Sequence, residues 1–306
     1  MLRILMPGLA LVISIMAFAG NPEGSKAAVR AEKVLRKQFK KQLDSTDKKI
    51  RYQTGRILIA GNSVVLDIPE QYKFIDAAQT RFILEDLWGN LPDSSVQGML
   101  VRKSFRINNA DEEFTYVISH HPIGYVKDHD AAETNYDDLI VELQRNQEKA
   151  NARRLEMGYN TMNIVGWAAV PRYDKDNHSV HWAKEIAVTG SDINVLNYEA
   201  RILGRNSMIS FNAVATMPQI EQVKKDLPNV IAIAKFTDGH QYDDFDKRTD
   251  SIAELTVGTI ISGNAAGQVA TISMISPKIV LGTLVIAGLI SGSFVALKRK
   301  VGRKEA

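Results

Sequence analysis

The pattern of hydrophobic and polar positions predicts a chain built from both strands and helices. Apolar residues alternate with polar ones in short runs bounded by Gly, Pro, Asn and Asp, which is typical of strands. These runs lie at residues 56–60, 63–68, 97–101, 113–119, 162–170, 180–188, 195–203 and 208–214. Three longer segments with apolar residues at helical spacing begin at Asp76, at Asn135 and near Met217. The side chains of Asp76 and Asn135 can each cap the first turn of a helix.

Turn sequences between neighbouring strands predict that most of the sheet is antiparallel. Gly61-Asn62, residues 174–177 and residues 204–206 each separate two predicted strands by a short polar stretch. Several hairpins interspersed with helices favour an α+β fold, with a layered, mostly antiparallel sheet and packed helices. Pro228 is expected to kink or end the last helix, and the following apolar run, 230–236, fits either a helix or a strand.

The first nineteen residues have the features of a secretory signal peptide. After Arg3 the chain is uncharged and apolar up to Ala17-Phe18-Ala19, the small-x-small pattern of a signal-peptidase site. The apolar run is short for a bilayer span. We therefore predict export, with cleavage after Ala19.

A second uncharged run near the end of the sequence predicts a transmembrane helix. Residues 279–297 are nineteen residues without a charge, and a helix of that length spans about 28 Å, close to the hydrocarbon core of a bilayer. Five basic residues follow within residues 298–304, whereas only Lys278 flanks the other side. The positive-inside rule places the tail in the cytoplasm and the bulk of the chain in the periplasm. We predict a single-pass protein of the bacterial inner membrane.

Together these features divide the chain into six segments. They are a signal peptide (1–19), a basic helical arm (20–50), an exported α+β domain (51–250), a juxtamembrane segment (251–277), a transmembrane helix (278–298) and a basic tail (299–306).

Charge and composition exclude several classes of function. The net charge is +3, but Arg3 contributes +1, residues 20–50 contribute +5, and Lys278 with the tail contributes +5, which leaves −8 for residues 51–277. An acidic domain argues against nucleic-acid binding. The absence of cysteine from the sequence removes thiolate nucleophiles and cysteine-ligated metals.

The sequence has no phosphate-binding loop, nucleophile elbow, dinucleotide fingerprint or zinc-protease motif. Asp128, Asp130, His178 and His181 are weak candidates for a metal site. His178 and His181 are three residues apart, so in a strand they point to opposite faces. Residues 174–185 space like a calcium loop, but the ligand series and the turn glycine both fail, and a hairpin turn is the simpler explanation of their Asp and Asn residues.

Several short motifs resemble those of one bacterial family. They are Gly124-Tyr-Val-Lys-Asp-His-Asp-Ala131, Gly166-Trp-Ala-Ala-Val-Pro-Arg-Tyr-Asp174, Trp182-Ala183, Asn197-Tyr198, Leu203-Gly204-Arg205 and Tyr242-Asp-Asp-Phe245. The family consists of predicted membrane-anchored proteins built on a domain of unknown function. The resemblance covers roughly residues 50–297 and implies an exported domain held at the inner membrane, with no catalytic residues to carry over. The layout of strand pairs followed by helices also resembles the PsbP-like α/β sandwich of small exported accessory proteins.

We therefore expect a non-catalytic, periplasm-facing accessory or binding protein that needs no cofactor. Its expected partners are the lipid bilayer and a protein of the envelope. The residues expected to converge near one edge of the sheet are Tyr125, Lys127, Asp128, Asp130, Trp167, Arg172, Tyr173 and Asp174. Among them we expect Lys127, Asp128, Arg172 and Asp174 to pair or to contact the partner.

Two alternatives stay open at this stage. One is a metal-dependent or acid/base envelope hydrolase that uses the aspartates and histidines named above. The other is a membrane scaffold that self-associates through Gly288 and Gly292, which lie on one face of the predicted transmembrane helix at the spacing of close helix packing.

Overall fold

Two units make up the chain, and one of them contains the sheet that dominates the structure. The computed structural model describes residues 34, 41, 43–88, 90, 92–107, 113–131, 133–156 and 160–262. The unit with the sheet comprises Arg51–Phe105 and Ala110–Pro277, and the other comprises Met1–Ile50, Arg106–Asn109 and Lys278–Ala306. In this second unit residues 43–47 are helical, and the Asp47 carboxylate accepts a hydrogen bond of 2.9 Å from the backbone of Ile107.

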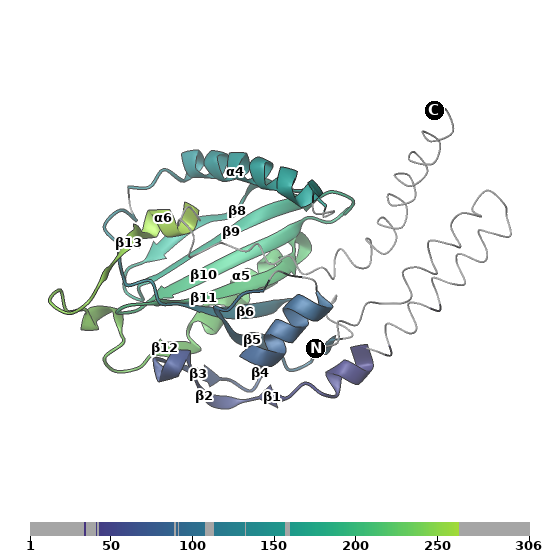
Figure 1. The fold of residues 1–306 in the computed structure, drawn as a ribbon, viewed down its shortest axis with the longest axis horizontal. Coiled ribbons are helices and arrows are strands. Elements are labelled where there is room, and N and C mark those ends of the chain that lie inside the picture. The colour runs from purple at the N-terminus through teal and green to yellow at the C-terminus, as the bar shows by residue number, and fades with distance from the viewer. Residues whose placement is uncertain are drawn as a thin grey trace, which may run out of the picture. The chain divides into compact units, whose positions relative to one another are not determined.

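The main sheet has eight strands, and each pairs with its neighbours in an antiparallel manner (Figure 1). Its spatial order is β1 (Tyr52–Gln53), β4 (Tyr72–Asp76), β5 (Val96–Arg102), β6 (Thr115–His121), β11 (Met208–Thr216), β10 (Val195–Leu203), β9 (Ser179–Val188) and β8 (Met162–Asp174). The four consecutive strands β8 to β11 include two hairpins that the sequence predicted at residues 174–177 and 204–206. The predicted antiparallel arrangement is therefore confirmed.

Two smaller sheets flank the main one. The first has the order β12 (Ala234–Phe236), β3 (Val64–Ile68) and β2 (Gly55–Ile59). The second pairs β7 (Tyr125–Lys127) with β13 (Ile252–Thr256) in parallel. The helices are α3 (Ala77–Arg81), which continues as a π-helix over Phe82–Leu87, α4 (Tyr136–Glu156), α5 (Ile220–Ile231) and α6 (Val257–Ser262).

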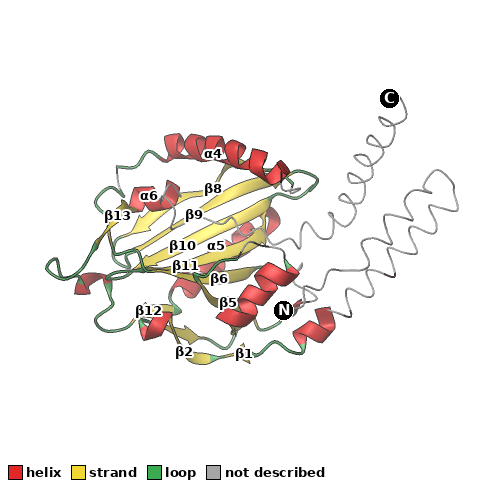
Figure 2. Ribbon diagram, in the orientation of Figure 1, coloured by secondary structure: helices red, strands yellow, loops and turns green. Residues whose placement is uncertain are grey.

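Helices cover both faces of the main sheet (Figure 2). On one face α5 and the β12–β3–β2 sheet pack against alternate residues of β10 and β11, and this core includes Leu66, Tyr198, Phe211 and Val223. On the other face α4 and α6 form a second core over β8 and β9, which includes Trp182. Helix α4 lies along the edge strand β8 (Figure 1).

Local signals in the sequence place the ends of the helices correctly. Asp76 caps α3 by accepting a hydrogen bond of 2.9 Å from the backbone of Gln79. Asn135 caps α4 by accepting from the backbone of Asp137 at 3.1 Å and of Asp138 at 3.3 Å. Both caps satisfy N–H groups that a helix leaves without internal partners.

The end of the last predicted helix differs in detail from the prediction. Pro228 does not end α5, since the helix continues to Ile231. The apolar run 230–236 contains the end of helix α5, at Ile231, and the strand β12, Ala234–Phe236. Residues 252–262, predicted as part of a juxtamembrane segment, form β13 and α6.

The predicted membrane segments lie outside the described residues. These are the signal peptide (1–19), the transmembrane helix (278–298) with Gly288 and Gly292, and the basic tail; of the basic arm (20–50), only part is described. Among the residues that are described, no helix combines the length and the apolar character that crossing a bilayer requires.

Candidate functional site

Four aromatic rings form a continuous stack beside β7. Tyr125 stacks on Phe245 with the ring centroids 3.9 Å apart, and its other neighbour is Tyr242 at 4.6 Å. Tyr242 in turn stacks on His178 at 4.0 Å. The rings come from β7, from the turn between β8 and β9, and from the loop that follows β12. Segments more than a hundred residues apart in the sequence thus meet at one place.

A chain of polar contacts runs along one side of the stack. The Tyr173 hydroxyl donates a hydrogen bond to the Asp128 carboxylate at 2.9 Å, and its oxygen lies 3.3 Å from Nδ1 of His178. Nε2 of the same imidazole lies 3.5 Å from the Asp243 carboxylate. Burial and the bond to Asp128 raise the pKa of Tyr173. The phenol therefore stays protonated and acts as a donor, not as a base.

A glycine allows β7 to approach β13 closely enough to pair. Gly124 has φ +90°, and a Cβ atom there would lie 3.0 Å from the backbone nitrogen of Ala253 and the backbone oxygen of Ser251. The backbone of Gly124 donates to Asn206, and that of Tyr125 donates to Ser251, both at 2.9 Å. The first residue of the Gly-Tyr motif is thus explained by steric requirements of the backbone.

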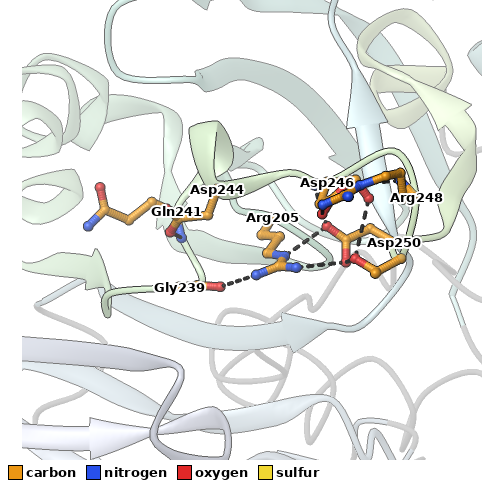
Figure 3. A network of polar contacts seen from close by, with 8 residues as sticks. Arg205, Gly239, Gln241, Asp244, Asp246, Arg248 and Asp250 are labelled. Atoms are coloured by element: carbon orange, nitrogen blue, oxygen red, sulfur yellow. Dashed lines mark hydrogen bonds and ion pairs between the residues drawn. The ribbon is translucent and has the colours of Figure 1, made fainter.

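Arg205 ties the loop of residues 238–250 to the turn between β10 and β11 (Figure 3). Its guanidinium binds the Asp250 carboxylate through two hydrogen bonds, of 2.8 and 3.0 Å, and a third, of 3.2 Å, reaches the backbone oxygen of Gly239. The hydrogen bond from Arg205 holds the pKa of Asp250 at about 2. Asp246 also accepts two hydrogen bonds from the guanidinium of Arg248. This loop carries Tyr242 and Phe245, so the Arg205 contacts position two of the stacked rings.

The arrangement forms one surface with an aromatic centre and charged margins, which we call the ring-stack surface. It consists of Tyr125, Lys127, Asp128, Tyr173, His178, Tyr242, Asp243 and Phe245. Tyr242 is buried at its centre and donates a hydrogen bond of 2.8 Å to the backbone oxygen of Val126. Asp243 and Lys127 are exposed, the Asp243 side chain to 88%.

The other residues predicted for the site serve different local contacts. Trp167 donates from its indole nitrogen to the backbone oxygen of Tyr136 at 2.9 Å, which joins β8 to α4. Asp130 accepts a hydrogen bond from Thr256 at the end of β13. Asp174 accepts from the backbone of residues 176 and 177 and from the Asn177 amide, which lowers its pKa. Its role is the hairpin turn that the sequence offered as one explanation.

Lys127, Asp128, Arg172 and Asp174 do not pair with one another as the sequence analysis allowed. Within the described ranges no ion pair joins any two of them. Asp128 binds a phenol, and Arg172 is an exposed residue of β8. The two motif segments that carry these residues do meet, through the hydrogen bond between Tyr173 and Asp128.

The structure does not assemble the four weak metal candidates. His178 belongs to the ring stack, whereas Nδ1 of His181 lies 3.1 Å from the Tyr198 hydroxyl, in the core on the opposite face of the sheet. Asp130 is engaged by Thr256. In the portion of the chain that is described, no three His, Asp or Glu side chains are placed to hold a metal ion.

Sequence reasoning did not assign Tyr242, Asp243 and Phe245 to the site. Their motif was visible as Tyr242-Asp-Asp-Phe245, but its sequence position lies more than sixty residues after Tyr173. The tertiary fold brings it to β7, where the Tyr242 hydroxyl donates to the backbone oxygen of Val126 and the rings of Tyr242 and Phe245 contact Tyr125. A contact between two of the family motifs, Leu203-Gly204-Arg205 and Tyr242-Asp-Asp-Phe245, would have indicated this position.

Comparison with known proteins identifies a family but no activity. The family model described as "Protein of unknown function (DUF2167)" matches residues 51–298, which confirms the resemblance to a family of unknown function. Among curated proteins none matches the sequence. A similar solved structure is the solution structure of cyanobacterial PsbP (CyanoP) from Synechocystis sp. PCC 6803, at 14% identity and a TM-score of 0.36, covering 61% of this chain and 92% of that chain. A likeness this distant supports no conclusion about function.

Proposed function

The chain belongs to the DUF2167 family of proteins of unknown function, and we propose that it is a non-catalytic accessory protein that binds a partner protein through the ring-stack surface. We further propose that the domain faces the periplasm and is anchored in the inner membrane by residues 278–298. The partner is a protein of the bacterial envelope.

The observation that carries this proposal is the convergence of three sequence motifs on the ring stack. Tyr125, Tyr173 and Tyr242 come from separate motifs, and contacts between aromatic rings and through His178 link them. A buried aromatic centre with a polar, accessible margin is the usual composition of a protein interface, in which tyrosine is enriched. The exposed Asp243 and Lys127 supply that margin.

The chemistry of the surface favours binding over catalysis. A general base must be free to take a proton from substrate, yet the Asp128 carboxylate already accepts a hydrogen bond from Tyr173, and Nδ1 of His178 faces the same Tyr173 oxygen. The raised pKa of Tyr173 also removes it as a nucleophile near neutral pH. These contacts hold the rings in place, and Tyr125 and Phe245 remain partly exposed.

Support for the membrane anchor comes from the sequence. The nineteen uncharged residues 279–297, followed by five basic residues, fit a helix that stops translocation with its tail in the cytoplasm. Alkaline carbonate washing of membrane vesicles should leave the intact protein in the membrane. Release by the wash, or a reporter fused to the domain that is active only in the cytoplasm, would contradict the proposed topology.

Site-specific photo-crosslinking tests the binding surface. A photoreactive amino acid at Asp243 should give a discrete adduct with one envelope protein in native membranes. Lys225, an exposed residue of α5 on the opposite face of the sheet, provides the matched control and should give none. The proposal fails if Asp243 gives no adduct, if both positions give the same adduct, or if the adduct contains only two copies of this chain.

A further inference from the structure

Three charged side chains are buried together on one face of the main sheet. Lys184 on β9 and Glu199 on β10 are each 4% exposed, and Arg201 on β10 is 2% exposed. The strand register places Lys184 opposite Asn197 and Glu199 opposite Trp182. Directly paired residues of antiparallel strands point to the same face, so these side chains share the face that carries Trp182.

The contacts within this group, the buried cluster, leave several atoms without partners. Asn212 donates to one oxygen of Glu199, and Arg201 donates to the backbone oxygen of Ile260 in α6 at 3.3 Å. Nε of Arg201 is 3.9 Å from the second oxygen of Glu199, too far for a hydrogen bond. The atoms that lack a hydrogen-bond partner here are the donors Arg201 Nε and Trp182 Nε1 and the acceptors Glu199 Oε2, Asn197 Oδ1 and Asn212 Oδ1.

The charges of the buried cluster do not cancel. Two cations, Lys184 and Arg201, share this face of the sheet with one carboxylate, Glu199. His121 on β6, which β11 separates from β10, adds no further positive charge, because burial and Arg201 hold its pKa at about 4 and leave it neutral. An uncompensated charge in a protein interior is strongly unfavourable.

We propose that the buried cluster binds one small monovalent anion, a carboxylate or a halide, between Lys184 and Arg201. Such an anion neutralises the excess positive charge and accepts hydrogen bonds from the unpaired donors Arg201 Nε and Trp182 Nε1 and from the Lys184 ammonium group. The alternative is that Lys184 loses its proton, and the two cases predict opposite responses to salt. This inference is independent of the proposed partner binding.

The experiment measures the melting temperature of the full-length chain in non-ionic detergent. Sodium acetate and sodium chloride are compared with sodium gluconate at equal ionic strength, since gluconate is too large for a buried site of this kind. At an anion concentration ten times the dissociation constant, the melting temperature should rise by roughly 3–5 °C relative to gluconate. A response to acetate alone assigns a carboxylate, and a response to chloride alone assigns a halide.

Variants distinguish a specific site from a general salt effect. Lys184→Met should lose the anion response, whereas Lys235→Met, at an exposed position on β12, should keep it. Glu199→Gln removes the buried negative charge and should enlarge the response. Equal melting temperatures of the wild type in all three salts, or an undiminished response in Lys184→Met, would overturn the proposal. Titration calorimetry of the wild type with acetate and with chloride provides a readout that needs no variant to fold, and heats of dilution alone for both would also overturn it.

Discussion

Replacing Gly124 with alanine tests whether close approach of β7 to β13 holds the ring-stack surface together. The added Cβ atom would lie 3.0 Å from two backbone atoms of β13 and its preceding residue, and φ at this position is +90°. Because both neighbours are backbone atoms, they cannot rotate away as a flexible side chain does. The strands must separate to accommodate the methyl group.

The expected loss in the free energy of unfolding has two parts. An alanine forced to positive φ costs roughly 1–2 kcal/mol, and overpacking against the neighbouring strand adds about 1–3 kcal/mol. Gly55→Ala separates the two contributions, because Gly55 begins β2 at positive φ (+77°) but has no atom within 4 Å of its added Cβ. Gly55→Ala should therefore cost only about 1–2 kcal/mol, and Gly124→Ala about 2–5 kcal/mol.

Hydrogen exchange of the full-length protein is the decisive assay. In Gly124→Ala the amide of Tyr125, which donates to Ser251 at 2.9 Å, should exchange at least tenfold faster, since 1.4 kcal/mol corresponds to a factor of ten. In Gly55→Ala it should be unchanged. Urea unfolding gives the total cost for each variant. If both variants cost the same and the Tyr125 amide stays protected in both, the close approach of the two strands does not position this surface.

Three further predictions concern hydrogen bonds and charge. Tyr173→Phe should lower the free energy of unfolding by about 1–2 kcal/mol because its hydroxyl bonds a carboxylate, whereas Tyr116→Phe should be neutral because its buried hydroxyl has no partner; urea unfolding checks both. Asn151→Ala should cost about 2–3 kcal/mol and deprotect the Met162 amide in hydrogen exchange, because Asn151 bonds both the nitrogen and the oxygen of Met162. Burial lowers the pKa of Lys184 to about 8, so between pH 8 and about 10 the unfolded chain binds more protons than the folded one. In gluconate the free energy of unfolding of the wild type should therefore rise with pH by up to about 3 kcal/mol relative to that of Lys184→Met. Denaturation at each pH measures this difference.

The parts of the fold that depend on nearby residues were predictable from the sequence. The caps at Asp76 and Asn135 and the turn at Gly61 each involve residues within a few positions of one another. The parallel pairing of β7 with β13 was not predictable, because it joins residues more than a hundred positions apart and β7 is only three residues long. The run 230–236 was ambiguous for another reason: its apolar residues suit both elements, and pairing of Lys235 with Val65 decides for a strand in its second half.

For the candidate site, the sequence predicted which segments come together, but not which contacts join them. Asp128 and Tyr173 were both selected, but a charge pair was expected where the structure has a phenol bound to a carboxylate. Composition indicates which charges are available, but only the tertiary fold determines which of them come within bonding distance.

The buried cluster shows where the hydrophobic pattern gives a wrong prediction of burial. Alternating polar residues such as Glu199 and Arg201 on β10 are normally assigned to the solvent-facing side of a strand, yet both are buried. Much of the polar chemistry in the family motifs has partners: Asp128 binds Tyr173, and Arg205 binds Asp250. The neighbouring strands β9, β10 and β11 hold five buried polar atoms without a hydrogen-bond partner, among them those of the motif residues Trp182 and Asn197. A group with an unmet charge responds to added ligand more than a group already paired, so this cluster is the place in the described domain where a small molecule should change stability most.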